Sequence, residues 1–229
     1  MCGIAGGYLL EMSEREIPDL LGRMNAAMIH RGPDEEGSWT APEMRAGLGV
    51  RRLSIVDLVT GSQPLLNEDG SVGLVANGEI YNHKTLRQQL EARGHRFRSK
   101  SDCEVILHLY EEYGTESLRH LNGMFSLAIL DRRQRRLLLA RDRTGMKHLY
   151  CARTSRGFLF ASEAKALFAS WLVSAEPDWE GLNVCLASQY IPAPMTCFRG
   201  IQRLPAGAFL LLEEGRETRG NFWTARFDN

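Results

Sequence analysis

The order of apolar and polar segments predicts an α+β fold built on antiparallel sheets. Apolar stretches with strand character come in hairpin pairs, as at 124–130 and 137–141, which flank a turn rich in arginine. Segments with helical periodicity also come in pairs, instead of alternating one by one with strands. Strands and helices grouped in this way are typical of α+β proteins, whereas strict alternation is typical of parallel α/β folds.

Local signals mark the ends of the predicted elements in the first half of the chain. One strand is expected to stop at Asn77-Gly78, a pair that commonly forms a tight turn. Asn82 can cap the helix that follows, and Ser101 with Glu104 forms a capping-box pattern before the next helix. The predicted elements of this half are strands at 3–10, around 39, at 44–48 and at 72–76, and helices at 18–32, 82–94 and 101–114.

The second half is predicted to be richer in strands. Ser162 and Asp178 are each expected to cap a helix, because short polar side chains can accept hydrogen bonds from the first turn. The predicted elements of this half are strands at 124–130, 137–141, 149–152, 157–161 and 209–212, and helices at 162–169 and 178–186.

Composition and charge exclude several classes of function. Lys plus Arg and Asp plus Glu number 28 each, so no basic field exists to attract nucleic acid or an anionic membrane. No apolar stretch is long enough to cross a bilayer, and the N-terminus lacks a signal-peptide pattern. Five cysteines without a CxxC pair and six histidines without ligand spacing predict neither a disulfide framework nor a metal site. We therefore expect a cytoplasmic protein with no metal and no membrane or nucleic-acid partner.

Cys2 is the first candidate for chemistry. Removal of Met1 would leave a thiol and a free α-amine on one residue. Such an amine has a pKa near ~7.7–8, so at neutral pH it can take the thiol proton and generate a nucleophile. We predict that a retained Met1 inactivates the protein, because the amine nitrogen is then part of a peptide bond. The alternative interpretation of Cys2 is a small buried residue that starts a strand.

Asn77 and Gly78 are the second candidate feature. A thiol that attacks a carboxamide needs hydrogen-bond donors for the negative oxygen that forms, and the pair offers a side-chain amide and a backbone N–H. One such donor can stabilise the transition state by about 2.7–4 kcal/mol. A type I′ hairpin turn remains the alternative interpretation of the pair.

Short segments in a fixed order connect the chain to a known family. They are MCGIAG at 1–6, HRGPDEEG at 30–37, RRLSIVDL at 51–58, NGEIYNH at 77–83, SDCEVI at 101–106, NGMFSLAI at 122–129, RDRTGMKHLY at 141–150 and FASEAKAL at 160–167. These segments, which span nearly the whole chain, resemble the class II glutamine amidotransferase domain of glutamine-hydrolysing asparagine synthetases. The tail at 190–212 resembles the part of that family that leads into its synthetase domain.

The resemblance implies a fold, a reaction and a set of roles. The fold is the N-terminal-nucleophile hydrolase sandwich, with two antiparallel β-sheets between helical layers. The reaction is hydrolysis of L-glutamine to glutamate and ammonia, with Cys2 as nucleophile and the Asn77 side chain and Gly78 N–H as the oxyanion hole. The implied substrate-binding residues are Arg52 for the α-carboxylate, Glu79 and Asp102 for the α-ammonium, and backbone groups of Leu53, Ile55 and Val56 along the pocket.

Each implied binding residue has an alternative interpretation. Arg52 could be a surface cation, Asp102 could help to cap the helix that begins there, and Glu79 could be a charge at a strand edge. Two other polar features are expected to be structural. His30 is expected to pack a turn, and the Arg141-Asp142 pair is expected to be a buried ion pair that shapes a sheet.

The family's enzymes continue into an ATP-dependent synthetase domain that amidates aspartate, and its SGGxDS phosphate loop does not occur here. We expect residues 1–229 to form the glutaminase domain, with 171–229 leading toward that synthetase domain. The second domain is expected on a longer version of the same chain, with a separate chain as the alternative. ATP and Mg²⁺ are expected only there, and this chain is expected to need no cofactor.

Two other functions stay open. The same glutaminase chemistry could serve a different carboxylate acceptor, since the second domain selects the acceptor. A glutamine-sensing module without turnover is the alternative from another class, although a binding module would need only Arg52 and the acids. The sequence leaves homodimerisation open as well.

Overall fold

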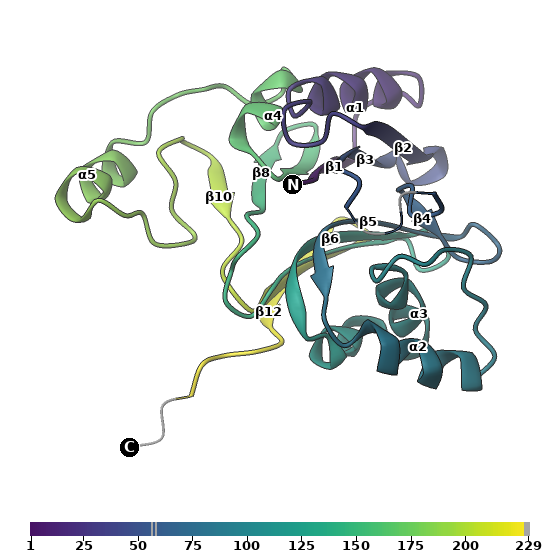
Figure 1. Ribbon diagram of the computed structural model, residues 1–229. Helices are drawn as coiled ribbons and strands as arrows, with labels where there is room; N and C mark the ends of the chain where they lie inside the picture. Colours follow the sequence, from purple (N-terminus) through teal and green to yellow (C-terminus); the bar gives the residue numbers. More distant parts are fainter. Residues whose placement is uncertain (56, 58, 227–229) are drawn as a thin grey trace.

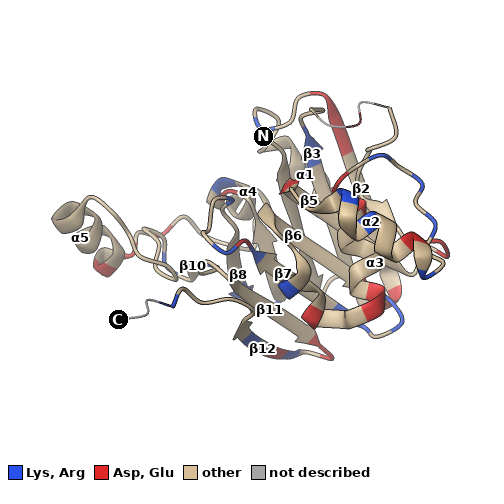
Figure 2. Cartoon of the chain, turned by 60° about the horizontal axis from the view of Figure 1, so that its bottom comes forward, with Lys and Arg blue, Asp and Glu red and all other residues tan. Residues whose placement is uncertain are grey.

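The computed structural model describes residues 1–55, 57 and 59–226. Two antiparallel sheets lie face to face at the centre of the molecule, and helices cover the outer face of each sheet (Figure 1). The α+β prediction of two antiparallel sheets between helical layers is therefore confirmed. Acidic and basic side chains are interspersed over the same strands and helices, as the balanced charge suggests (Figure 2).

The first sheet has β1 near its centre and carries the N-terminus. Its strands follow the order β10-β8-β9-β1-β3-β2. Their bounds are β1 (Gly3–Leu9), β2 (Glu35–Ala41), β3 (Ala46–Arg52), β8 (Tyr150–Thr154), β9 (Gly157–Ala161) and β10 (Ile201–Arg203). Because Gly3 pairs with Arg51, the start of β1 and the end of β3 lie at the same end of the sheet.

The second sheet has the order β12-β11-β7-β6-β5-β4. Its strands are β4 (Leu65–Leu66), β5 (Val72–Ile80), β6 (Gly123–Asp131), β7 (Arg136–Arg141), β11 (Ala208–Glu213) and β12 (Arg216–Asn221). The neighbour of β5 on the side away from β6 is the short strand β4, which pairs only with Leu74 and Gly73. The later part of β5 therefore presents an edge that β4 does not cover.

The main core lies between the two sheets, and both faces of the second sheet are buried. Along β6, Ala128 and Leu130 point toward the first sheet, while Leu127 and Ile129 pack against helices. Side chains in a strand alternate between faces, so this burial explains the continuous apolar run in the sequence. Leu48 on β3 belongs to the same inter-sheet core.

Helices cover the two outer faces. On the first sheet these are α1 (Glu16–Ala26) and α4 (Ala164–Ala169), and on the second they are α2 (His83–Ala92) and α3 (Glu104–Tyr113). A fifth helix, α5 (Trp179–Ser188), stands apart from the sandwich (Figure 1). None of the described helices combines the length and apolar character that a bilayer crossing needs.

Several local predictions hold and others are corrected. Asp178 accepts a hydrogen bond from Gly181 N at 3.0 Å and caps α5 as predicted. Asn82 precedes α2 but does not cap it, since its side chain bonds the 120–122 segment instead. The Ser162 hydroxyl accepts a hydrogen bond from Ile4 N at 3.0 Å. It therefore connects the segment before α4 to β1 and does not cap the helix.

The capping box predicted at the start of α3 is also wrong. The Glu104 carboxylate accepts hydrogen bonds from the N–H groups of Arg98 and Ser99, at 2.7 and 2.8 Å, and does not reach back to Ser101. The Ser101 hydroxyl accepts from Cys103 N at 3.3 Å. Strand β12 was not predicted, because it is a mostly exposed edge strand whose charged and polar residues give no apolar signal.

Candidate active site

A cavity of about 180 Å³ lies between the end of the first sheet, where β1 starts and β3 stops, and the edge of β5. Every predicted site residue that the structure describes lines this cavity. These residues are Cys2, Arg52, Leu53, Ile55, Asn77, Gly78, Glu79 and Asp102. Val56, the remaining predicted residue, lies outside the described residues. A larger cavity beside β10 contains none of them.

Cys2 lies directly before β1, and its thiol is half-buried in the cavity wall. The Sγ–H group donates to the carbonyl oxygen of Leu53 across 3.7 Å. Met1 also lines the cavity, is 59% exposed, and has its sulfur 3.2 Å from Nζ of Lys147. With Met1 attached, the nitrogen of Cys2 belongs to a peptide bond and cannot act as a base.

A charged pair beneath Cys2 fixes its backbone. Arg31 donates from Nε to the carbonyl oxygen of Cys2 at 2.9 Å and from Nη1 to Glu163 at 2.9 Å. His30 contacts the same carboxylate at 3.0 Å with an exposed side chain, so it supports Glu163 rather than packing a turn as predicted. Burial alone would raise the pKa of Glu163, but Arg31, His30 and Lys165 outweigh it and lower that pKa to about 2. Glu163 therefore stays ionised and keeps Arg31 in place.

Gly78 presents its N–H to the cavity because of its position in β5. Backbone groups of alternate residues in a strand point to the same edge. Ala76 N donates to the Gln63 side chain at 2.7 Å, and Ile80 N donates to Asp102 at 2.6 Å, both away from β6. Gly78 lies between them on the same edge. Phe125, opposite Gly78 on β6, exchanges its hydrogen bonds with Asp142 instead.

Only glycine fits at position 78. A Cβ atom there would lie 2.0 Å from the carbonyl oxygen of Met124 and 2.6 Å from the Cα of Phe125. The close approach of β6 therefore excludes any side chain. The prediction that the strand stops at Asn77-Gly78 is wrong, as is the alternative of a hairpin turn, because β5 continues to Ile80.

Asn77 brings a second donor to the same wall. Its side chain is 2% exposed, and its Nδ2 atom has no hydrogen-bond partner among the described residues. A buried polar group without a partner costs about 1–3 kcal/mol, so such groups in a native fold call for an explanation. A donor kept for a negative oxygen that is present only during the reaction is such an explanation.

Arg52 places a buried cation in the cavity wall. Its side chain is buried, pairs with Glu35 across 2.6 Å, and donates from Nη2 to the carbonyl oxygen of Asp57 at 2.6 Å. Arg51, by contrast, pairs with Glu36 and caps carbonyl groups outside the cavity. The interpretation of Arg52 as a surface cation is therefore wrong, whereas its role toward a substrate stays a prediction.

Glu79 and Asp102 form an acidic pair in the cavity wall. Asp102 is buried and accepts from Ile80 N, so it belongs to the end of β5 rather than to a helix cap. Burial, and then the nearby Asp102 charge, raise the pKa of Glu79, while Lys147 opposes that shift. Two carboxylates held this close favour a bound cation between them.

Sequence reasoning missed several residues of the cavity. Lys147, Gln63 and Cys103 line it without a predicted role. Lys147 belongs to the quoted segment RDRTGMKHLY, in which Asp142 accepts from Lys147 N at 3.0 Å and so shapes the loop. Asp142 and Arg141 form hydrogen bonds with backbone groups rather than with each other, so the prediction of an ion pair between them is wrong.

Two sheets between helical layers, with a thiol residue directly before a central strand, define the class of N-terminal-nucleophile hydrolase folds. A solved structure described as the allosteric regulatory enzyme of purine biosynthesis resembles this chain in fold. It superposes with a TM-score of 0.71 at 20% sequence identity and covers 98% of this chain and 50% of that chain. This likeness confirms the predicted fold.

The chain belongs to the glutamine amidotransferase domain family, whose sequence model matches residues 1–223. It is 39% identical to asparagine synthetase [glutamine-hydrolyzing] 2 of Bacillus subtilis (strain 168), over 98% of this chain and 31% of that protein. It is 32% identical to amidase chry2 of Gibberella zeae, over 99% of this chain and 35% of that protein. The chain thus spans about a third of the length of these curated relatives.

Proposed function

We propose that this chain hydrolyses the side-chain amide of L-glutamine to glutamate and ammonia, with Cys2 as the nucleophile. The single observation that carries this proposal is the convergence of the Cys2 thiol and the donors of Asn77 and Gly78 on one cavity. The cavity also holds the Arg52 guanidinium and the acids Glu79 and Asp102, a charge pattern that suits a free amino acid. The family to which the chain belongs supports the same reaction.

The reaction begins after Met1 has been removed. The α-amine of Cys2 takes the thiol proton, and the sulfur attacks the side-chain carbonyl carbon of glutamine. The Asn77 amide and the Gly78 N–H donate to the oxygen that becomes negative. The amine then passes its proton to the departing nitrogen, which leaves as ammonia. Water attacks the remaining thioester with the amine as base, which releases glutamate and restores the thiol.

Charged groups orient the substrate along the cavity. The planar guanidinium of Arg52 suits the α-carboxylate, since it can donate two parallel hydrogen bonds. Glu79 and Asp102 are placed to hold the α-ammonium. Backbone groups of Leu53, Ile55 and Val56 complete the pocket in this proposal. These contacts fix the amide carbon relative to Cys2 and so lower the entropic cost of the attack.

We further propose that the ammonia serves an ATP-dependent synthetase domain that amidates aspartate. Support comes from the asparagine synthetase relatives, of which this chain spans about a third. ATP and Mg²⁺ would then be needed only in that domain. A reducing compartment such as the cytoplasm suits the thiol chemistry, because all five cysteines are free.

One observation favours a second candidate acceptor. A relative that matches nearly this whole chain is named an amidase rather than an asparagine synthetase. The same glutaminase chemistry with another carboxylate acceptor is therefore the second candidate. A glutamine-sensing module without turnover is disfavoured, because binding alone gives no reason for the unpartnered Asn77 amide.

Replacement of each cavity thiol in turn tests the proposed nucleophile. We expect Cys2→Ala to abolish glutamate release from glutamine and Cys103→Ala to keep most of it. Cys103 lines the same cavity, but burial raises the pKa of its thiol well above the ordinary value, so it is a poor nucleophile. Unchanged glutamate release by Cys2→Ala would refute the proposal.

Removal of the residues that precede Cys2 tests whether its free α-amine is the base. The chain can be produced with an N-terminal extension that a protease removes to leave Cys2 as the first residue. We expect no glutaminase activity before cleavage and full activity afterwards, with the intact mass confirming each species. Equal activity of the two species would rule out the α-amine as the base.

A further inference from the structure

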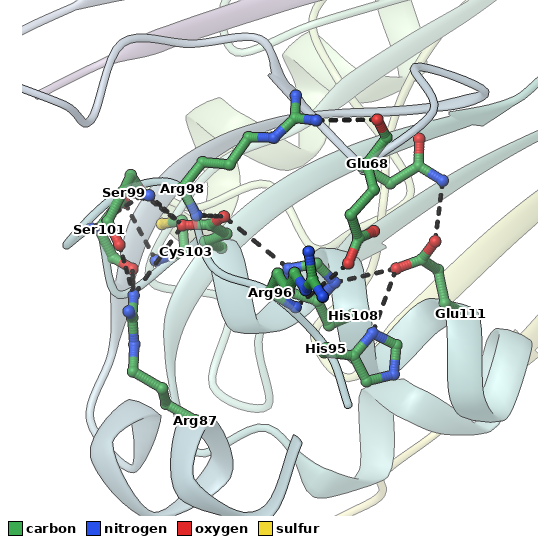
Figure 3. A network of polar contacts seen from close by, with 12 residues as sticks. Glu68, Arg87, His95, Arg96, Arg98, Ser99, Ser101, Cys103, His108 and Glu111 are labelled. Atoms are coloured by element: carbon green, nitrogen blue, oxygen red, sulfur yellow. Dashed lines mark hydrogen bonds and ion pairs between the residues drawn. The ribbon is translucent and has the colours of Figure 1, made fainter. Parts of the chain in front are cut away.

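A second cluster of titratable side chains lies outside the glutamine cavity, beside helix α3. Glu68, His95 and His108 each offer a ligand atom, and these atoms all lie within 4.8 Å of one another. Figure 3 shows the three side chains converging from the β4–β5 region, from the loop after α2 and from α3. Because the three come from separate segments, no ligand spacing in the sequence could have revealed the cluster.

Carboxylates orient both imidazole rings from outside. His108 has Nδ1 at 2.9 Å from Glu111, and His95 has Nε2 at 2.9 Å from Glu112. The second ring nitrogens face acids only at longer range, with His95 Nδ1 at 3.7 Å from Glu111 and His108 Nε2 at 3.8 Å from Glu104, so neither contact is a hydrogen bond. Metal-binding histidines commonly hold a carboxylate on the ring nitrogen that does not ligate, since this fixes the tautomer and ring direction.

The available nitrogen of His108 is the strongest indication of a ligand. His108 is 1% exposed, and its Nε2 atom has no hydrogen-bond partner among the described residues. The nearest acid, Glu104, has its oxygen 3.8 Å away, which is too far for a hydrogen bond. A buried nitrogen left without a partner costs free energy unless something binds to it.

We propose that Glu68, His95 and His108 bind one divalent transition-metal ion of the Zn²⁺ class. Two imidazoles and one carboxylate are a donor set that Zn²⁺ prefers, with water as a fourth ligand. Ligand atoms of a tetrahedral zinc lie about 3.3 Å apart, so the cluster has to contract slightly. Glu68 can supply that movement because it is exposed and its carboxylate accepts a hydrogen bond of only 3.2 Å from Arg96 N.

The ion would lie behind the wall of the glutamine cavity rather than in it. Glu104, one turn before His108 on α3, accepts hydrogen bonds from Ser99 N and Ser99 Oγ. Ser99 Oγ in turn accepts from Ser101 N at 3.1 Å, and Ser101 lines the cavity. The metal would therefore fasten the 95–101 loop to α3 and would take no part in the attack by Cys2.

Metal binding by variants of the 229-residue chain tests this proposal. Co²⁺ is titrated into Cys2→Ala protein and into the same protein carrying Glu68→Gln or His95→Gln. We expect one Co²⁺ per chain with visible bands of a tetrahedral site, and at least about tenfold weaker binding in each variant. His83→Gln, a change at a half-exposed histidine on α2, should bind as the parent does. Zn²⁺ should displace the Co²⁺ and raise the Tm of the parent and of His83→Gln more than that of Glu68→Gln or His95→Gln.

Three results would overturn the proposal. The first is no bound metal in a parent that is folded by circular dichroism, which would leave the cluster as a set of ion pairs. The second is binding that both variants keep. The third is a sulfur-to-cobalt charge-transfer band, because it would place the ion on cysteine instead. Glu68→Gln and His95→Gln carry the test, since both residues are less buried than His108.

Discussion

The Nε atom of Arg31 donates a hydrogen bond to the carbonyl oxygen of Cys2 at 2.9 Å. The same guanidinium is held by Glu163, which follows β9 on the far side of β1. The residue before the first strand is thus anchored by a side chain from a different element. Arg31 acts on the reaction only through the position of Cys2.

Arg31→Lys therefore tests positioning of the nucleophile. A lysine lacks the planar fork whose Nε and Nη1 reach Cys2 and Glu163 separately, so we expect one of the two bonds to be lost and kcat to fall about tenfold, the effect of one charge-assisted hydrogen bond. KM for glutamine should change little, because the charged groups that hold the substrate are intact. Lys165→Gln is the control, since Lys165 contacts Glu163 at 3.2 Å but makes no hydrogen bond to Cys2. A rise in KM with unchanged kcat would contradict this role.

Asn77→Ala tests the oxyanion hole. Removing one donor that acts mainly in the transition state should lower kcat about 10²–10³-fold and leave KM nearly unchanged. Asn77→Asp should be similarly inactive despite its equal size, because a carboxylate accepts hydrogen bonds and repels a negative oxygen. Steady-state kinetics of both variants provides the measurement. An Asp variant with normal kcat would exclude the proposed donor role.

Gly78→Ala tests the close approach of β6. The new methyl group would collide with the carbonyl oxygen of Met124, so we expect a loss of at least about 2 kcal/mol in the free energy of unfolding, together with lost activity. Gly22→Ala is the matched control, because nothing lies within 4 Å of its Cβ position on α1. That change should stabilise the protein by ~0.5–1 kcal/mol. Urea denaturation measures the free energy of unfolding of both variants. Equal values for Gly78→Ala and Gly22→Ala would contradict the steric role of β6.

Glu79→Gln should separate stability from substrate binding. The folded-state pKa of Glu79 is raised, chiefly by burial, so its stabilising contribution is present below the ordinary value of 4.5 and is lost as pH rises through the folded-state pKa. At pH 7 the ionised group therefore costs stability, and Glu79→Gln should raise Tm. This gain should shrink as pH falls toward 4.5.

The same variant should bind glutamine more weakly. Loss of a charged partner for the α-ammonium should raise KM about tenfold or more. In the unchanged protein, KM should rise as pH falls and Glu79 takes up a proton. Glu91→Gln, an exposed position on α2, should change neither Tm nor KM. A Glu79→Gln variant that is less stable at pH 7 would contradict the assigned pKa direction.

The layers of this fold could be predicted from the sequence because they depend on local patterns. Apolar runs such as 124–130 indicate strands buried on both faces, and arginines between two runs indicate a hairpin. Asn77-Gly78 was mispredicted because its turn preference is local, whereas pairing with Ser126 and Phe125 keeps it in the strand. That pairing joins residues almost fifty positions apart and leaves no local signal.

Residues of the candidate site could be predicted only where they stand in the segments that resemble the family. Cys2 and Asp102 stand in such segments, and the structure brings them to one cavity. The bond between Arg31 and Cys2 and the role of Glu163 depend on contacts between distant segments, so neither could be assigned in advance. Whether Val56 completes the pocket stays a prediction, since it lies outside the described residues.

Covalent labelling tests the central claim most directly. Protein with Met1 removed is treated with a glutamine analogue that carries an electrophilic carbon in place of the side-chain amide, and peptides are mapped by mass spectrometry. We predict one adduct per chain, on Cys2, that excess glutamine prevents and that Asn77→Ala slows. Labelling of Cys103 in place of Cys2, or no labelling of a fully processed chain, would contradict the account.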